Sequence, residues 1–333
     1  MYQTININGS NYKLDLANSY LTQAEKLIVK SKLNREKEKE YLTKAKDYIE
    51  KAKISTILAD NVQLNNFILP KKPNTKFKDI AGLEITKDKI KLKAIEPLKN
   101  PKLFELFEKK FGGGILMYGP PGCGKSFIAE ATAGEANATF FNIRASDLKS
   151  KYVGETEQNI AKLFESARQH QPSIIFFDEF ESLGQERNGA TPHDKSMISQ
   201  LLTEINGLGN KEQKILLIAA TNEPWSIDLA LRREGRFGTS IFIPPPDLEG
   251  RKTILKNQLK NKPIENIDFN LLAEITDFYS GADLLEICNI AAENVLSECI
   301  KEDKVRPIIM KDILNAIDNK KELITIKWFN KAL

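Results

Sequence analysis

Cysteine, histidine and long apolar runs are scarce in this sequence. Its 333 residues include three cysteines, Cys123, Cys288 and Cys299, and two histidines, His170 and His193. Their wide spacing excludes the usual cysteine and histidine zinc sites and the HExxH pattern of zinc proteases. An odd number of cysteines without a secretion signal favours reduced thiols.

No segment approaches the about 20 consecutive apolar residues that span a bilayer. The longest apolar runs, 174–177 and 215–220, suit buried strands instead, and the N-terminus lacks the apolar core of a signal peptide. With 41% hydrophobic and 28% charged residues, the composition is typical of a soluble globular protein. We therefore expect a cytoplasmic protein without a transmembrane segment.

The net charge of +4 is unevenly distributed along the chain. Residues 1–72 hold 12 Lys and 1 Arg against 8 acidic residues, so the basic excess lies in this segment and the remainder is close to neutral. A solvated helix surface would explain this excess. The alternative is a patch for an acidic partner, a nucleic acid or an anionic membrane.

The N-terminal segment changes its hydrophobic period. Residues 2–16 alternate around Asn8-Gly9, which predicts a β-hairpin. Apolar residues at helical spacing over 16–28 and 34–52 predict two helices that pack as an antiparallel hairpin. The prolines of the 70–73 stretch cannot lie within a helix and predict a linker.

From about residue 77, short apolar segments alternate with helical ones, the pattern of a parallel sheet covered on both faces. Strands are expected at 115–118, 139–143, 174–177, 215–220 and 240–243. Mostly helical sequence follows the proline run 244–246. We therefore predict a hairpin-plus-helices segment over 1–72 that binds substrate or an adaptor, a large α/β domain over 73–247 and a small helical lid over 248–333.

A glycine-rich loop follows the first of these strands. It matches GxxxxGK[ST] and lies between an apolar strand and a helix, the context that this phosphate-binding motif requires. Backbone N–H groups would surround phosphate oxygens, Lys125 would reach the β- and γ-phosphates, and Ser126 would bind Mg²⁺. The predicted ATP-binding residues here are Gly119, Pro120, Pro121, Gly122, Cys123, Gly124, Lys125, Ser126 and Phe127. The sequence therefore predicts an α/β P-loop NTPase with ATP and Mg²⁺ as cofactors.

Polar residues end two other predicted strands. Asp178 and Glu179 follow the strand at 174–177, and Asn222 follows the strand at 215–220. Parallel sheets bind ligands at the carboxyl ends of their strands. We expect Asp178 to hold Mg²⁺, Glu179 to activate the attacking water, and Asn222 to hold that water or sense the γ-phosphate.

At these residues the chain resembles the AAA ATPases, the family that includes katanin, spastin and the proteasomal ATPases. The resemblance covers about residues 77–333 and rests on several motifs in a fixed order. It implies that the segment with Asp79 and Gly82 borders the adenine, and that Gly281 and Ala282 approach the adenine from the lid.

Arginines in the segment 228–237 resemble the family's second region of homology. The resemblance implies that Arg233 and Arg236 are arginine fingers that enter the ATP site of a neighbouring subunit. A guanidinium can stabilise the charge of a transferring phosphoryl group, and such a finger accelerates related NTPases by about 10³–10⁵. Activity would then require a homo-oligomer, and a hexamer is what the resemblance implies.

The segment with Lys151, Tyr152 and Val153 resembles the family's first pore loop. In a ring these side chains would project into the channel and grip an extended protein substrate, because tyrosine offers apolar area at little rotamer entropy. The alternative is that Tyr152 packs under its own loop.

Four residues depart from the family's usual pattern. Cys123 occupies a position where the family usually has Thr or a small residue, and its oxidation would impair nucleotide binding. Glu181, Asn206 and Gly238 occupy positions where the family usually has Asp. These departures concern communication between subunits and remove no residue that hydrolysis needs.

The sequence therefore predicts a ring-forming, Mg²⁺-dependent ATPase that unfolds, threads or disassembles protein substrates. The alternative is a nucleotide-gated scaffold or assembly factor that does not thread substrate. A nucleic-acid remodeller is disfavoured, since the core is nearly neutral and shows no nucleic-acid-binding motif.

Overall fold

The computed structural model describes residues 22, 23, 26, 43–47, 49, 70–107, 113–148, 154–183, 192–208, 214–320 and 323–332. The chain forms two units, Met1–Leu69 and Pro70–Leu333. In the first unit the described residues are helical and fall within the two stretches predicted as helices, whereas the predicted hairpin over 2–16 lies outside the described residues.

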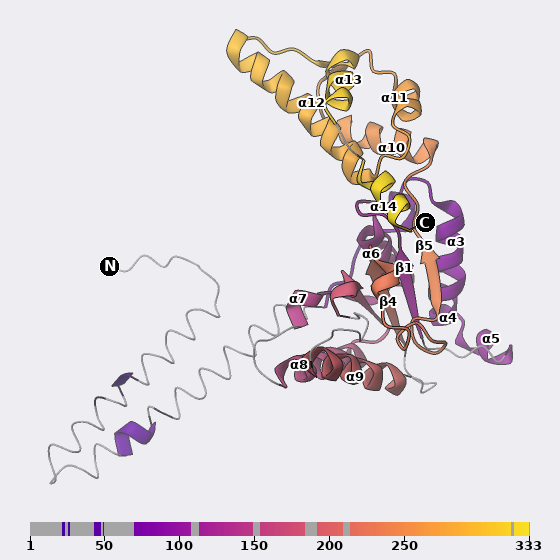
Figure 1. Cartoon of the computed structure of the whole chain (residues 1–333), viewed down its shortest axis with the longest axis vertical. Coiled ribbons are helices and arrows are strands. Elements are labelled where there is room, and N and C mark those ends of the chain that lie inside the picture. The colour runs from indigo at the N-terminus through magenta and orange to yellow at the C-terminus, as the bar shows by residue number, and fades with distance from the viewer. Residues whose placement is uncertain are drawn as a thin grey trace. The chain divides into compact units, whose positions relative to one another are not determined.

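The second unit begins with helices and continues as alternating strands and helices (Figure 1). Its first part contains η2 (Phe77–Asp79), α3 (Glu84–Ile90), the π-helical turn η3 (Lys91–Ile95), α4 (Glu96–Lys99), α5 (Pro101–Leu106), β1 (Gly114–Tyr118), α6 (Lys125–Ala136), β2 (Thr139–Arg144), α7 (Ala145–Leu148), α8 (Glu155–Gln169), β3 (Ser173–Asp178), η4 (Phe180–Ser182), α9 (Pro192–Gly207), β4 (Ile215–Thr221), η5 (Pro224–Ser226) and β5 (Thr239–Phe242).

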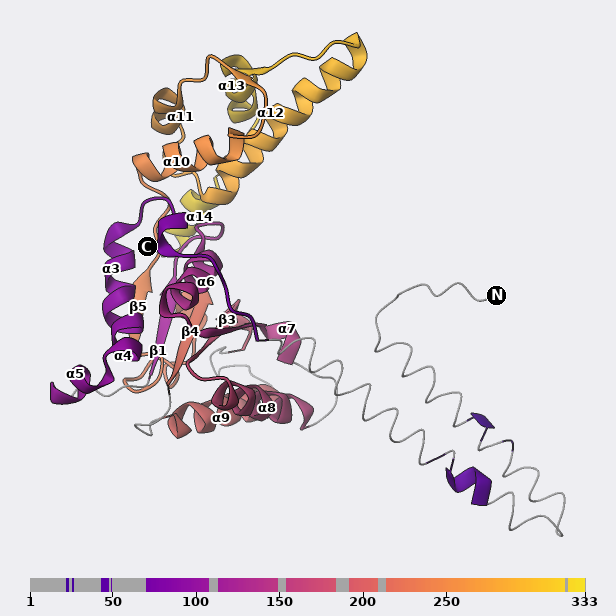
Figure 2. The ribbon, with the colours of Figure 1, turned by 180° about the vertical axis from the view of Figure 1, so that it is seen from behind.

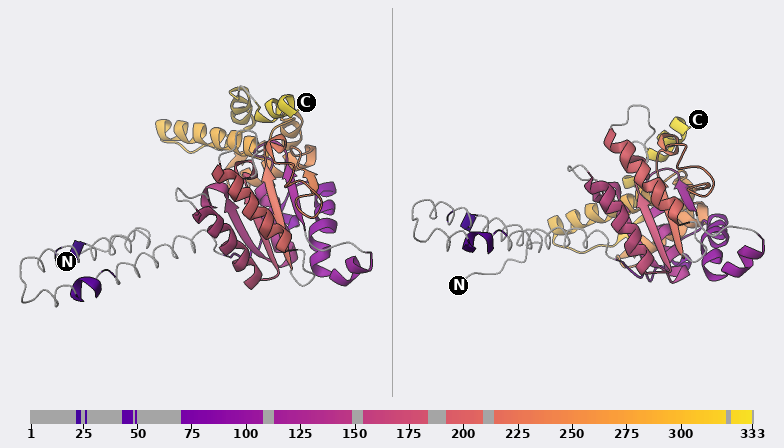
Figure 3. Two further views of the ribbon diagram at one scale, coloured as in Figure 1. Left: turned by 60° about the horizontal axis from the view of Figure 1, so that its bottom comes forward. Right: turned by 90° about the horizontal axis from the view of Figure 1, so that it is seen from below.

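The strands β1 to β5 form one parallel sheet in the order β2-β3-β4-β1-β5. Each predicted strand agrees with an observed one to within one residue at either end. Strands β3 and β4 are short, continuous apolar runs, as expected where helices cover both faces of a sheet. Helices α3 and α6 lie on one side of the sheet and α8 and α9 on the other (Figure 3). The predicted α/β P-loop fold is confirmed.

Successive side chains of the strands enter opposite cores. Ile115 and Met117 of β1 pack with Ile128 of α6 in one core, while Leu116 between them faces the other side and is also buried. The sheet is therefore a buried platform whose strand ends are held in fixed register.

The predicted linker adds to this platform. Lys71 and Phe140 of β2 exchange backbone hydrogen bonds of 3.1 and 2.7 Å, which form an antiparallel bridge at the edge of the sheet. The stretch 70–73 is therefore extended along β2, as its prolines require.

The remainder of the unit is mostly helical, as the sequence predicts for the lid. It contains α10 (Leu248–Leu259), β6 (Ile264–Glu265), α11 (Phe269–Ile275), α12 (Gly281–Glu302), β7 (Ile308–Ile309), α13 (Met310–Asp318) and α14 (Ile324–Ala332). Buried residues of α10 to α13, among them Leu255, Leu272, Ile287 and Ile313, form a core of their own. Figure 2 shows α12 as the long helix of this part. Across the described part of the chain, none of the helices is both long and apolar enough to traverse a lipid bilayer.

Candidate active site

The glycine-rich loop connects the end of β1 to the start of α6. Gly124, with φ at 82°, precedes the first helical residue, Lys125. Lys125 is 8% exposed, and its ammonium donates hydrogen bonds to the carbonyl oxygens of Gly119 at 2.9 Å and Pro120 at 2.8 Å. The amino end of α6 and this cation therefore face the same loop, an arrangement suited to phosphate.

The surroundings of Lys125 have opposing effects on the pKa of its ammonium group. Burial lowers the pKa of Lys125, while the negative groups Glu181 and Asp178 act to raise it. A phosphate beside this ammonium would stabilise the charged form further.

Asp178, the last residue of β3, reaches the loop from the neighbouring part of the sheet. Ser126 donates a hydrogen bond of 2.8 Å from its hydroxyl to Asp178 Oδ2. Glu181 adds a buried carboxylate oxygen, Oε2, that has no hydrogen-bond partner among the described residues. A hydroxyl and carboxylates are the hard oxygen ligands that Mg²⁺ takes in phosphate sites, so these residues fit the ion. In the part of the chain that the structure describes, no group of three or more histidine, cysteine, aspartate or glutamate side chains could hold a metal ion by itself.

Glu179 follows directly and lies in a turn. Its backbone is left-handed, with φ at 51°, and the side chain is exposed. Its carbonyl oxygen accepts a hydrogen bond of 2.7 Å from the hydroxyl of Ser182. The turn therefore leaves this carboxylate free of the sheet, at the same end as Asp178.

Asn222 lies between the phosphate loop and the acidic residues that end β3, because β4 lies between β1 and β3. Tyr118 of β1 pairs with Thr221 of β4, so the residues that follow them, Gly119 and Asn222, are neighbours. Asn222 Oδ1 accepts a hydrogen bond of 2.7 Å from Lys125. The structure thus brings the phosphate loop, the acidic residues that end β3 and the Asn222 amide together at the carboxyl ends of the strands.

The lid contacts the loop directly. Gly122 O accepts a hydrogen bond of 3.2 Å from the backbone N–H of Ala282, which together with Gly281 begins α12. A Cβ on Gly122 would lie 2.7 Å from Ser280 Oγ and 2.8 Å from the Cβ of Ala282, so only glycine permits this approach. The predicted lid residues therefore lie beside the predicted phosphate loop.

The segment before α3 approaches the start of the lid. A Cβ on Gly82 would meet Asp247, which caps α10, at 2.8 Å. Asp79 accepts a hydrogen bond of 2.8 Å from the backbone N–H of Lys76. Lys87, which is 4% exposed and which the sequence did not single out, fixes this segment by a 2.8 Å bond to Ile80 O.

Cys123 packs within the loop and is 6% exposed. Burial raises the pKa of the Cys123 thiol to about 12, although Lys125 acts to lower it. Thiols react with oxidants as thiolates, so this environment disfavours the predicted sensitivity to oxidation.

The two predicted fingers lie at the other end of the sheet. The carbonyl of Arg236 accepts a hydrogen bond from the backbone N–H of Gly114, the first residue of β1. Its guanidinium bonds Ala230 O at 2.7 Å and Asn206 Oδ1 at 3.3 Å, and Arg233 is exposed. Asn206, one of the four departures, is therefore a partner of a predicted finger.

Gly238, another departure, closes the same turn. A Cβ there would lie 2.9 Å from the Cα of Glu234 and 3.1 Å from the carbonyl oxygen of Arg233. The turn is therefore too tight for the aspartate that the family usually has. The predicted pore-loop residues Lys151, Tyr152 and Val153 lie outside the described residues.

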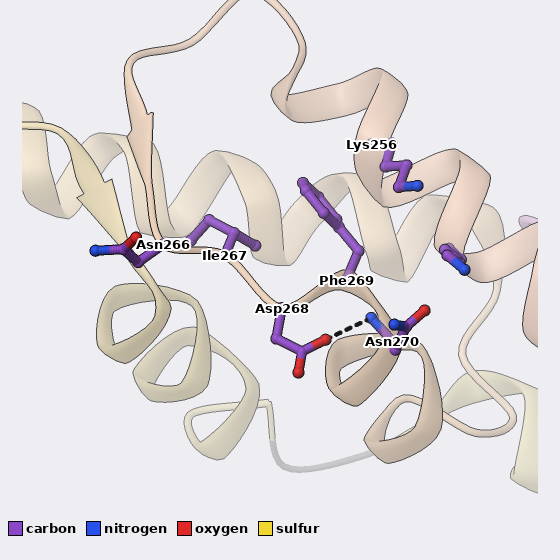
Figure 4. Close-up of a pocket in the computed structure, with 7 residues that line it drawn as sticks. Lys256, Asn266, Ile267, Asp268, Phe269 and Asn270 are labelled. Atoms are coloured by element: carbon purple, nitrogen blue, oxygen red, sulfur yellow. Dashed lines mark hydrogen bonds between the residues drawn. The ribbon is translucent and has the colours of Figure 1, made fainter.

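A separate hollow of about 470 Å³ lies in the lid, where Lys252, Lys256 and the segment 266–270 line it (Figure 4). Lys256 lies over the ring of Phe269, and Asp268 caps α11. None of the predicted site residues lines it.

Trp328 contacts the site, and the sequence analysis did not single it out. The indole N–H of Trp328 in α14 donates a hydrogen bond to the backbone carbonyl of Asn222. Its sequence signal is the scarcity of tryptophan, since the chain has only two, Trp225 and Trp328. In the structure the centroids of these two rings lie 5.9 Å apart.

Comparison with known proteins places this site in a family. Residues 115–245 match the ATPase family associated with various cellular activities (AAA), and residues 266–314 match the AAA+ lid domain. The cell division cycle protein 48 homolog of Archaeoglobus fulgidus is 42% identical over 270 residues, which are 80% of this chain and 36% of that protein. Protein SAV of Sulfolobus acidocaldarius is 39% identical over 250 residues, which are 74% of this chain and 32% of that protein. The chain thus spans about a third of the length of these relatives.

The two matched ranges contain the residues of the site. The phosphate loop and the strand ends lie in the first range, and the start of α12 lies in the second. The family implies nucleotide binding, and the loop at the start of α6 fits a phosphate group. The chain belongs to the ATPase family associated with various cellular activities (AAA).

Proposed function

We propose that this chain binds ATP with Mg²⁺ at the phosphate loop and hydrolyses it within a ring of identical copies, which unfolds, threads or disassembles protein substrates. Lys125 and the loop amides bind the phosphates. Ser126 and Asp178 hold Mg²⁺, which supplies positive charge at the phosphoryl oxygens. Asn222 holds the attacking water or senses the γ-phosphate.

Glu179 acts as the general base. It deprotonates the water that attacks the γ-phosphorus, and a positioned carboxylate contributes about 10²–10⁴ to such a step. Its exposed position beside Asp178, outside the sheet, supports this role.

The arginines act on a neighbouring copy. Arg236 is bonded at the first residue of β1, whereas the phosphate loop begins after the last. The five residues of β1 separate these ends by about 16 Å, more than an arginine side chain spans. Arg233 and Arg236 therefore need another subunit's nucleotide, which makes closed oligomers, with six copies by family resemblance, the active form.

Protein substrates are gripped by Tyr152 with Lys151 and Val153. ATP binding closes the interface between copies and hydrolysis releases it, which moves the loop along the channel. The basic segment 1–72 recruits the substrate or an adaptor.

The single observation that carries the proposal is the meeting of Lys125, Asp178 and Asn222 at the carboxyl ends of the strands, with Arg236 bonded at the amino end of β1. The test separates hydrolysis from pulling. Tyr152→Ala should retain ATPase activity and lose unfolding of a tagged fluorescent protein, while Tyr152→Phe retains both. If Tyr152→Ala unfolds the substrate normally, the gripping role of Tyr152 is wrong. If neither the wild type nor Tyr152→Ala unfolds the substrate although both hydrolyse ATP, a scaffold that does not thread is the better function.

Glu179→Gln tests the chemistry in the same assay. It should bind ATP, accumulate as an oligomer and hydrolyse at least about 100-fold more slowly. Normal turnover in this variant would contradict the base assignment. Partners trapped by Glu179→Gln, with and without residues 1–72, identify what the basic segment binds.

A further inference from the structure

Helix α14 lies against the strand ends that carry the site, far in sequence from both. Figures 1 and 2 show it beside the end of β5, between the sheet and the start of α12. Its Trp328 donates to the backbone carbonyl of Asn222. A residue 106 positions away in the sequence thus contacts the backbone of the amide that bonds Lys125.

Aromatic packing fixes the indole in this position. The Trp328 ring is stacked on Phe242 of β5 at 6.1 Å and lies 5.9 Å from Trp225, which follows Asn222 by three residues. Phe329 packs edge-on against Phe242 at 6.3 Å. Such aromatic pairs stabilise a contact beyond their buried area, so the indole N–H has a defined direction.

An ion pair holds the same segment from the next turn of α14. Lys331 lies 2.6 Å from a carboxylate oxygen of Glu223 and 5.1 Å from the centre of the Trp225 ring. Hydrogen bonds from Lys331 and Ser226 hold the pKa of Glu223 below its usual value. Helix α14 therefore contacts residues 222, 223 and 225 through four interactions.

The backbone of Asn222 needs such a contact, because the sheet no longer holds it. The register of β4 against β1 ends at Thr221, which pairs with Tyr118. Beyond this pair the carbonyl of Asn222 leaves the ladder, and the indole of Trp328 satisfies it. The side chain of the same residue bonds Lys125 at 2.7 Å, so a change in its backbone direction moves the amide within the site.

We infer that Trp328 is a positioning residue for ATP hydrolysis: its indole N–H fixes the backbone of Asn222 and thereby aims the Asn222 amide at the γ-phosphate end of the site. The inference rests on the role proposed above for Asn222. The contact of Trp328 is with the backbone of Asn222, so its effect passes through Asn222.

The test is a double-mutant cycle on the full chain. Trp328→Phe keeps an aromatic ring and removes the donor, and should lower kcat about three- to tenfold, the effect of one neutral hydrogen bond, with KM for ATP within about twofold. In an Asn222→Ala background, where the backbone carbonyl remains but the amide is gone, the same substitution should change kcat by less than about 1.5-fold. Equal loss in both backgrounds would overturn the inference, because a merely structural role is additive.

Thr325→Val is the matched control. Thr325 also donates from α14 to a backbone carbonyl, that of Phe278, which lies in the lid and not at the strand ends. Thr325→Val should lower the melting temperature about as much as Trp328→Phe and leave kcat unchanged. A fall in kcat as large as that of Trp328→Phe would assign the effect to loosening of α14 and would overturn the inference.

Crystal structures of the wild type and of Trp328→Phe decide the matter independently of turnover. The Asn222 amide should leave Lys125 in the variant, and an unchanged contact would overturn the inference. Absence of turnover in the wild type would overturn the proposed function, whereas the position of Asn222 would still be read from these structures.

Discussion

The amide oxygen of Asn222 lies 2.7 Å from the ammonium nitrogen of Lys125. These residues are 97 positions apart, and their strands meet because β4 lies directly beside β1 in the sheet. The contact joins the residue that we propose binds the phosphates to the residue that we propose senses them. It also makes the charge at position 222 decisive.

Asn222→Asp should therefore weaken ATP binding. A carboxylate in place of the amide would pair with Lys125 and repel the phosphates, and one such repulsion at contact distance is about 1–4 kcal/mol in a partly solvated site. The dissociation constant for ATP, measured by calorimetry with Mg²⁺, should rise at least about fivefold. Asn222→Ala, which adds no charge, is the control, and an equal dissociation constant in the two variants would contradict this reading.

The position of Arg236 predicts complementation between two inactive variants. Lys125→Ala removes the phosphate contact but leaves the arginines, whereas Arg236→Ala leaves the phosphate site and removes a finger. Each alone should lose about 10³ in ATPase rate. Mixed in equal amounts, they form interfaces that pair an intact site with an intact finger, and activity should recover to a fraction of the wild type.

The recovery should depend on exchange of subunits. Wild-type chain mixed with the double variant Lys125→Ala/Arg236→Ala is the control, since that variant contributes neither an intact site nor an intact finger. If Arg236→Ala alone retained full activity, or if mixing restored nothing, the finger would not act between copies.

The sheet and the phosphate site were predictable because their signals are local. Strands such as β3 and β4 are continuous apolar runs that end in polar residues, and the loop before α6 follows a fixed spacing. The fold and the family are confirmed, and the residue roles remain predictions. Boundaries shifted by one residue at some ends, because strand ends depend on hydrogen bonds with neighbouring strands that the sequence does not show.

What the sequence could not provide are contacts between distant segments. The bond from Trp328 to Asn222 and the buried lysine at position 87 depend on packing, and neither residue belongs to a local pattern. The sequence also did not explain why glycine occupies position 238. The structure explains it, because the backbone of Glu234 lies too close to Gly238 for a side chain.

The thiol of Cys123 should be nearly inert in the folded protein. Its pKa of about 12, against an ordinary value of 9.0, implies about a thousandfold smaller thiolate fraction near neutral pH. Alkylation by iodoacetamide at about pH 8, followed by mass spectrometry, should modify Cys299 first, because it is partly exposed and Cys123 is buried. Modification of Cys123 as fast as Cys299 would contradict the burial, and denatured protein is the control for complete labelling.

The ion pair between Lys320 and Asp283 should make stability depend on pH. Their charged atoms lie 2.7 Å apart, and the side chains are 12% and 5% exposed. Burial alone would raise the pKa of Asp283, but hydrogen bonds from Lys320 and Ser280 hold it below the usual 3.8. The wild type therefore gains stability from this carboxylate above about pH 3.8 and loses it as the pH falls through the lower folded pKa.

Lys320→Met should reverse this dependence, because it leaves a buried carboxylate without its cation. Removing one partner of a buried pair costs about 3–5 kcal/mol, so the free energy of unfolding in urea should fall by about 3 kcal/mol at neutral pH. In the variant burial raises the pKa of Asp283, so the folded state takes up a proton as the pH falls, and the difference from wild type should narrow toward about pH 4. Glu286→Gln, which removes the exposed second partner of Lys320, should cost about 1 kcal/mol or less. A loss in Lys320→Met that is the same at both pH values would show that Asp283 is not the group that titrates.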